Sequence, residues 1–207
     1  MPSIDHLVLA CTDVDAMTQH LGSVLGVRPS PGGRHVGRGT RNTLLSFGDR
    51  SYLEVIGPDL EAPEPESPRP FGVDAIVAPG LAGWAVAVDD IDAVVARARA
   101  EGYDPGDPLS MQRDTPEGTM LSWRLTFAPA WANGVVPFLI DWGTTTHPST
   151  TCAQGATLQT LAFGHPDTAR VGAAFRALGI DREVRVTLRP WIHADISGPS
   201  GTIVLGL

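Results

Sequence analysis

The chain has 207 residues, of which 43% are hydrophobic and 18% are charged, and its formal net charge at pH 7 is −8. This length allows one large hydrophobic core or two small ones. The acidic balance, without any cluster of Lys and Arg, argues against nucleic acid and anionic membranes as partners, because phosphate groups are bound by clustered basic residues.

The sequence shows no sign of membrane insertion or secretion. No apolar run approaches the ~20 residues that a membrane-spanning helix requires, and the first residues lack a basic flank followed by an apolar core. Cys11 and Cys152 are too few for a disulfide framework in a chain of this size. We therefore expect a globular protein of the cytoplasm.

The first residues predict a strand followed by a helix. Residues 4–10 form a short apolar run typical of a buried strand, and Thr12 or Asp13 can cap the helix after it. Gly26 is a suitable residue to end that helix. Between the cap and the stop, one helical face is apolar, at Met17, Leu21, Val24 and Leu25.

The segment 30–57 completes a first structural unit. It contains a glycine-rich loop or edge strand, and then two strands around a turn at Gly48 and Asp49. Residues 1–58 thus predict one unit with the order strand, helix and three strands, written βαβββ.

The same order of elements repeats downstream. Residues 12–16 align without a gap on residues 89–93, an offset of 89 − 12 = 77. A second βαβββ unit is therefore predicted over residues 79–146, with a hairpin at residues 116–118. The segment 59–78 between the two units is dense in proline and acidic residues, which predicts an extended linker.

A third, shorter copy of the pattern follows a Thr- and Ser-rich connection. Residues 156–207 again predict a strand, an acidic cap, a helix and three strands. We therefore predict an α+β fold made of three βαβββ units, in which the first two units build the principal cleft.

Two polar residues lie inside otherwise apolar strands of the first unit. His6 stands in the run DHLVLA and Glu54 in the run YLEVIG. A buried carboxylate needs a partner, because an unpaired buried charge costs several kcal/mol. An imidazole and a carboxylate on neighbouring strands suit a divalent ion such as Zn, Ni, Mn or Fe. The alternatives are a hydrogen-bonded core histidine and an ion pair between Glu54 and a nearby arginine.

The glycine-rich segment GGRHVGRGTRN carries a second group of candidates. His35, Arg38, Arg41 and Asn42 could bind an anionic substrate or one with neighbouring oxygens, because the arginine fork matches carboxylate and phosphate geometry. His35 could also act as a further metal ligand. The alternative is a solvated loop whose glycines only serve its turns.

The runs IDHLVLACTDVDAM and SYLEVIG resemble the vicinal oxygen chelate superfamily, and GGRHVGRGTRN extends the resemblance to its glyoxalase-like domain family. The resemblance covers roughly the first 145 positions. It implies that paired βαβββ units curl into half-barrels around a cleft, where a divalent metal chelates two neighbouring oxygens of the substrate. Members of the superfamily include lactoylglutathione lyase, extradiol dioxygenases, epimerases and fosfomycin-resistance transferases, and others only bind a drug such as bleomycin.

The resemblance also implies which residues hold the metal. His6 and Glu54 match the two ligand positions of the first unit, whereas the corresponding positions of the second unit are Gly83 and Ile140, which have no ligand atoms. Asp141 lies one residue further, so its side chain should point to the opposite face of the strand. Two protein ligands are fewer than the three that a catalytic metal normally has.

These observations lead to two hypotheses of function. In the first, the protein is a metal-assisted lyase, isomerase or dioxygenase that acts on a small oxygenated metabolite. Glu54 would be the catalytic carboxylate and one of the metal ligands, with His6 as the other. In the second, the protein binds a small molecule or sequesters a drug without a metal. A partner-binding module with a decayed site is a third interpretation. We expect a small-molecule ligand in either of the first two cases, and the protein could form a homodimer.

Overall fold

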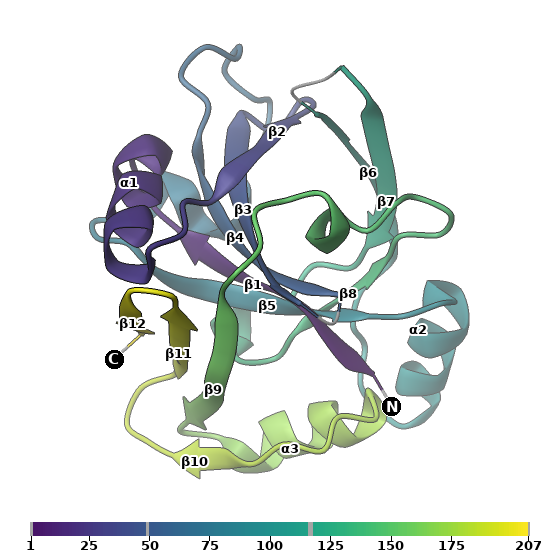
Figure 1. Ribbon diagram of the computed structural model, residues 1–207. Helices are drawn as coiled ribbons and strands as arrows, with labels where there is room; N and C mark the ends of the chain where they lie inside the picture. Colours follow the sequence, from purple (N-terminus) through teal and green to yellow (C-terminus); the bar gives the residue numbers. More distant parts are fainter. Residues whose placement is uncertain (1, 49, 116–117, 207) are drawn as a thin grey trace.

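The computed structural model describes residues 2–48, 50–115 and 118–206, and it consists of a β-barrel with a smaller sheet beside it (Figure 1). The turn residue predicted at Asp49 and most of the hairpin turn predicted at 116–118 lie outside the described residues. None of the helices in the described part of the chain is long and apolar enough to cross a membrane.

The observed elements follow the predicted order three times. The first unit contains β1 (Ser3–Ala10), α1 (Val14–Leu25), β2 (Ser30–His35), β3 (Thr40–Gly48) and β4 (Ser51–Pro58). The second contains β5 (Gly80–Ala87), α2 (Ile91–Ala100), β6 (Leu109–Asp114), β7 (Met120–Leu125) and β8 (Phe138–Asp141). The third contains β9 (Thr157–His165), α3 (Thr168–Ala177), β10 (Val184–Val186), β11 (Trp191–Gly198) and β12 (Gly201–Leu205). The α+β fold of repeated βαβββ units is confirmed.

Each helix begins at the cap that the repeat predicts. Asp13 accepts hydrogen bonds from the backbone N–H groups of Asp15 and Ala16, and Asp90 accepts one from Ala93. These side chains satisfy donors that the first turn of a helix leaves unpaired. At the end of α1, Gly26 adopts a left-handed conformation with φ 75°, which is accessible to glycine at little cost.

The strands of the first two units close into one barrel, in the order β1-β4-β3-β2-β6-β7-β8-β5. The halves meet along two seams. At one seam β1 pairs with β5 over most of its length, and at the other β2 pairs with β6 at Arg34 with Asp114 and at His35 with Arg113. His35 and Arg113 therefore come from different units and lie side by side.

The third unit forms a separate sheet in the order β10-β9-β11-β12, which lies beside α1 and β5 (Figure 1). The third sheet shares one hydrophobic core with the outer face of the barrel. The Trp84 ring of β5 stacks on Phe163 of β9 with ring centroids 4.9 Å apart. Phe175 of α3 packs edge-on against both rings.

The predicted linker 59–78 includes a short 3-10 segment, η1 (Pro70–Ala75), rather than being extended throughout. Phe71 within it has φ 59°, a left-handed conformation that side chains other than glycine seldom adopt. Val73 is buried, and Phe71 packs against Phe138 of β8. The segment thus covers part of the barrel interior.

Candidate functional site

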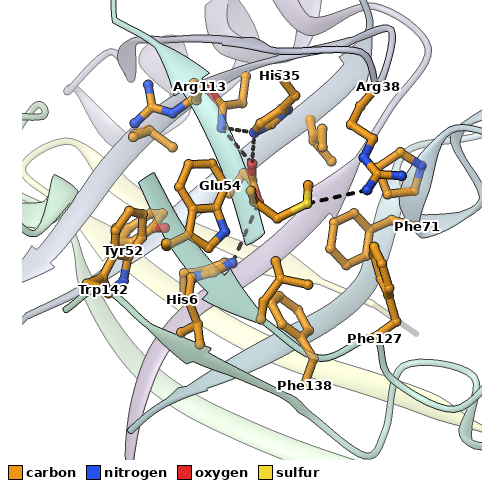
Figure 2. A pocket seen from close by; sticks show the side chains of 18 residues that line it. His6, His35, Arg38, Tyr52, Glu54, Phe71, Arg113, Phe127, Phe138 and Trp142 are labelled. Carbon is orange, nitrogen blue, oxygen red and sulfur yellow. Dashed lines mark hydrogen bonds and ion pairs between the residues drawn. The ribbon is translucent and has the colours of Figure 1, made fainter. Parts of the chain in front are cut away.

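A cavity lies inside the barrel and is lined by side chains of both units and of η1 (Figure 2). The centre of a water molecule can occupy about 40 Å³ of it, and the atom-free space of the cavity together with its open mouth is about 550 Å³. Most of the wall is apolar, and its aromatic members are Tyr52, Phe71, Trp123, Phe127, Phe138 and Trp142. The polar members are His6, His35, Arg38, Asn42, Glu54 and Arg113.

Strand alternation explains which residues reach this cavity. On β4, Tyr52, Glu54 and Ile56 line it, and Ile140 takes the place of Glu54 on the corresponding strand β8. Asp141, the next residue, instead accepts hydrogen bonds from the backbone N–H groups at positions 91 and 143. Asp141 thus serves the start of α2, as the alternation predicts.

Glu54 is buried at the centre of the polar side chains, with only 6% of its surface exposed (Figure 2). Its Oε1 accepts a hydrogen bond of 2.6 Å from Asn42 Nδ2 and lies 3.7 Å from His35 Nε2. Its Oε2 lies 3.6 Å from His6 Nε2. The two imidazoles come from β1 and β2, so the carboxylate lies between side chains that the sequence separates by 29 positions (35 − 6 = 29).

His6 is held in place by Asp5, the residue before it. The pairing of β1 with β5 shifts register between Ile4 and His6, which places a bulge at Asp5. A bulge lets two successive side chains point toward the same side of a strand. Asp5 Oδ1 lies 2.6 Å from His6 Nδ1, and the ring of His6 stacks on Tyr52. His6 is thereby fixed with Nε2 toward Glu54.

Asp5 is fully buried and has two further partners. Its Oδ2 accepts a hydrogen bond from Trp142 Nε1 at 3.0 Å and lies 3.0 Å from His147 Nε2. Burial raises the pKa of this carboxyl group, but the contacts with His147 and His6 outweigh that effect and lower the pKa to about 2. Asp5 is therefore an anion beneath the cavity.

His35 is buried in the wall of the cavity, where burial lowers its pKa to about 4. The nearby Glu54 carboxylate opposes this shift, and the Arg113 guanidinium adds to it. His35 is therefore a neutral imidazole near pH 7. Its Nδ1 lies 2.9 Å from Thr40 Oγ1, and Asn42 Nδ2 lies 3.4 Å from its Nε2.

The structure brings most of the predicted site residues together, but not Arg41. His6, His35, Arg38, Asn42 and Glu54 all line the cavity. Arg41 points away from it, because it alternates with Asn42 on β3, and it forms an ion pair with Asp15 of α1 at 2.7 Å. The position of Arg41 therefore gives no support to its predicted role in binding a ligand in the cavity.

Several residues of the site were not predicted from the sequence. They include Asp5, Tyr52, Arg113, Trp123 and His147. Tyr52 could have been found from strand alternation, because it stands two positions from Glu54 on the same strand, whereas Arg113 stands two positions from Met111, which the sequence did not single out. Asp5 could not, because the bulge that turns it inward leaves no mark in the hydrophobic pattern.

The side chains of the site fit a metal centre poorly. The parts of the chain that the structure describes contain no group of three or more His, Cys, Asp and Glu side chains that could hold a metal ion. At Gly83, an added Cβ atom would meet only the ring of Phe71, at 3.9 Å. An aromatic ring thus lies next to the position where the resemblance implies a ligand in the second unit.

One solved structure agrees with the fold over the whole chain. A crystal structure of a hypothetical protein from Staphylococcus aureus is similar at a TM-score of 0.64 and 18% identity, covering 100% of this chain and 85% of that one. Methylmalonyl-CoA epimerase from Mycobacterium tuberculosis matches at a TM-score of 0.44 and 22% identity, covering 67% of this chain and 86% of that one. No curated protein matches the sequence. The family model described as "Glyoxalase-like domain" matches residues 4–179, and the chain therefore belongs to the glyoxalase-like domain family.

Proposed function

We propose that the protein is an enzyme that moves a proton on a small oxygenated metabolite, with Glu54 as the general base. The observation that carries the proposal is the position of Glu54, a buried carboxylate that lines an aromatic cavity, accepts a hydrogen bond from Asn42 and lies 3.6–3.7 Å from two imidazole nitrogens. A general base needs a fixed geometry and restricted access of water. The barrel provides both.

The proposed step can be written with its atoms balanced. A proton on the carbon next to a carbonyl group passes to Glu54, and the electron pair of that C–H bond moves to the carbonyl oxygen as an enolate. Return of the proton to the same or a neighbouring carbon completes an isomerisation. Arg38, whose guanidinium lies at the cavity, stabilises the negative oxygen. Asn42 and His6 keep the carboxylate in position throughout.

The second candidate function uses a divalent ion bound by His6 and Glu54. It is considered because His6 Nε2 and Glu54 Oε2 lie 3.6 Å apart. Zn, Ni, Mn and Fe are the ions that suit this pair. No step above depends on such an ion. Elemental analysis of protein purified without a histidine tag tests it: one bound ion per chain that is lost in His6→Ala supports the metal, and metal-free protein with proton-transfer activity argues against it.

The partners that we propose are a small-molecule ligand in the cavity and, as suggested from the sequence, a second copy of the chain. The two outer strands of the third sheet expose Val186 and Val204, which are apolar positions on unpaired edges. Sedimentation velocity measures the association state, and a monomer at all concentrations would remove the homodimer from the proposal.

Proton transfer can be tested before the substrate is known. The protein is incubated in deuterium oxide with a panel of small oxo and hydroxy acids, and proton spectra follow the signal of the C–H next to each carbonyl. We expect wild type to exchange at least one compound and Glu54→Gln to be inactive, with Glu66→Gln, a change at an exposed carboxylate, as the matched control. Exchange that survives in Glu54→Gln contradicts the proposal, and binding without exchange favours the metal-free binder.

A further inference from the structure

The cavity contains an indole N–H without a partner. Two other buried indoles have acceptors. Trp84 Nε1 donates to the backbone oxygen of Val135 at 2.9 Å, and Trp142 Nε1 donates to Asp5 at 3.0 Å. Trp123 Nε1 is buried too, and the described residues offer it no acceptor. Buried indole N–H groups normally donate a hydrogen bond. The unmet donor therefore calls for an acceptor from outside the chain.

A second donor at the cavity is also poorly satisfied. Within the described residues, the side-chain partners of Arg38 are the sulfur of Met111, 3.6 Å from one guanidinium nitrogen, and the Phe127 ring at 6.0 Å. A thioether sulfur is a weak acceptor. Five other arginines each pair with one or more carboxylates, namely Arg34, Arg41, Arg69, Arg99 and Arg124.

Both donors line the same cavity, and Met111 connects their positions in the wall. Met111, which Arg38 contacts, is the cross-strand partner of Trp123 in the β6–β7 ladder. Figure 2 shows Arg38 at one side of the cavity with Phe71 and Phe127, while Tyr52 and Trp142 lie at the other side and Glu54 between them. Arg38 thus lies next to an aromatic surface, and the Trp123 ring packs against Trp142 with centroids 5.1 Å apart.

Charge supports the same conclusion. Arg38 lines the cavity, and its described side-chain contacts, with Met111 and Phe127, include no carboxylate. A cation without a carboxylate partner attracts an anion even in an acidic protein.

From these observations we infer that the cavity binds a small monocarboxylate with a flat apolar body. Its carboxylate accepts hydrogen bonds from Trp123 Nε1 and from part of the Arg38 guanidinium, whose remaining N–H groups are left for the enolate oxygen. Its apolar part lies among Phe71, Phe127 and Phe138. The inference deepens the proposed function by naming the class of its substrate. It requires the carbon that loses the proton to lie toward Glu54.

Three probes separate the features of such a ligand. Benzoate has the ring and the carboxylate, benzyl alcohol has the ring without the charge, and acetate has the charge without the ring. Binding is followed in a proton–nitrogen correlation spectrum of the tryptophan indoles, in which Trp123→Phe identifies the Trp123 signal. We expect benzoate to move that signal downfield while the Trp84 signal, whose N–H is already bonded, stays in place.

Matched variants test the arginine. Arg38→Lys keeps the charge and loses the fork, and it should weaken benzoate binding by about tenfold or more, the fold-change that corresponds to one hydrogen bond to a charged group. Arg41→Lys, which changes an arginine outside the cavity, should bind as wild type does. Trp123→Phe keeps an aromatic ring, and it should weaken benzoate binding without changing the affinity for benzyl alcohol.

Three results overturn the inference: no shift with benzoate, equal affinity for benzoate and benzyl alcohol, or equal affinity for benzoate and acetate. Benzoate has no exchangeable proton next to its carboxylate, so its binding reports only on the class of ligand. Binding of benzoate by a protein that exchanges no proton would therefore reject the proposed function alone. Proton exchange on a neutral compound would reject the ligand class alone.

Discussion

Asp5 links the candidate site to the core through three side chains. It accepts hydrogen bonds from Trp142 and lies within 3.0 Å of ring nitrogens of His6 and His147, with no surface exposed to solvent. Hydrogen bonds to a buried charged group contribute more than neutral ones, and their loss leaves polar atoms without partners. The geometry of His6 therefore depends on a carboxylate that does not itself line the cavity.

We expect Asp5→Asn to lower the free energy of unfolding by about 3 kcal/mol, since it removes charge-assisted hydrogen bonds from a buried network. Urea denaturation measures this loss. Asp15→Asn is the matched control, because Asp15 pairs with Arg41 at an exposed position where an ion pair contributes under about 1 kcal/mol. Equal effects of the two substitutions would mean that the Asp5 network adds nothing beyond a surface pair.

The buried imidazole of His35 makes stability depend on pH. The pKa of His35 is about 4 in the folded protein, whereas an ordinary histidine side chain has a pKa of 6.5. Between these two pH values the imidazole is protonated in the unfolded chain and neutral in the folded protein. Stability is therefore complete above pH 6.5 and falls as the pH drops toward 4, by roughly 3 kcal/mol. The groups that face His35 are Glu54, Arg113, His6 and Arg38.

The test compares the unfolding free energies of wild type and His35→Asn across this pH range. The difference between the two proteins should change by roughly 3 kcal/mol in favour of the variant as the pH falls, since Asn takes up no proton. His20→Gln, a change at an exposed histidine, should leave the slope unchanged. Parallel curves for wild type and His35→Asn would contradict the assignment of a neutral buried imidazole.

At the residue scale, polar residues inside apolar strands, together with the resemblance, predicted part of the site. His6 and Glu54 were expected to face the same cavity, and their side chains lie 3.6 Å apart. Arg41 was placed with Arg38 because both stand in one glycine-rich segment, but the alternation of β3 turns Arg41 toward α1. Trp123 was not predicted, because its distinguishing feature, an indole N–H without a described acceptor, depends on the folded structure and leaves no signal in the sequence.

At the element scale, the helix caps and strand order could be predicted because they rest on local signals that occur three times. Asp13, Asp90 and Asp167 each cap the helix of their own unit. The 3-10 segment η1 could not be predicted, because the left-handed φ of Phe71 has no local cause in its sequence. The tertiary contact of its ring with Phe138 accompanies that conformation.

The third unit is joined to α1 by a close backbone approach. Ser200 N–H donates to the backbone oxygen of Leu25 at 3.0 Å, and a Cβ atom added at Gly198 would lie 2.4 Å from that same oxygen. We expect Gly198→Ala to lower the free energy of unfolding by about 1–3 kcal/mol, the usual cost of overpacking. Thermal unfolding followed by circular dichroism measures it.

Gly80→Ala is the control for this prediction. Gly80 is also in a strand, but an added Cβ atom would meet nothing within 4 Å. That substitution should be neutral or stabilise by about 0.4–1 kcal/mol, because it reduces the freedom of the unfolded chain. If the Gly198→Ala protein were as stable as the Gly80→Ala protein, the backbone of Gly198 would not be in close contact with the backbone oxygen of Leu25 at the end of α1.

At the scale of the whole molecule, the cluster of Trp84, Phe163 and Phe175 joins the barrel to the third unit. The sequence predicted the three units but not this contact, because the pairing of distant aromatic residues follows from the arrangement of the sheets. A continuous core favours one cooperative unfolding transition. Trp fluorescence and circular dichroism should therefore report the same midpoint.

We expect Phe163→Ala to lower the free energy of unfolding by about 3–5 kcal/mol, the range for a buried phenylalanine. Leu188→Ala, at a side chain that is 97% exposed, should change it little. Two separate transitions in wild type, or a small effect of Phe163→Ala confined to one of them, would mean that the third unit folds independently of the barrel.

The measurement that tests the central claim most directly is chemical rescue at Glu54. With the compound that wild type exchanges in deuterium oxide, Glu54→Ala should lower the exchange rate by about 10²–10⁴-fold, the range for loss of a general base. Added formate, a small carboxylate that can enter the space left by the side chain, should restore part of the rate in Glu54→Ala and leave wild type unchanged. Exchange that persists in Glu54→Ala without formate would contradict the assignment of Glu54 as the base in this cavity.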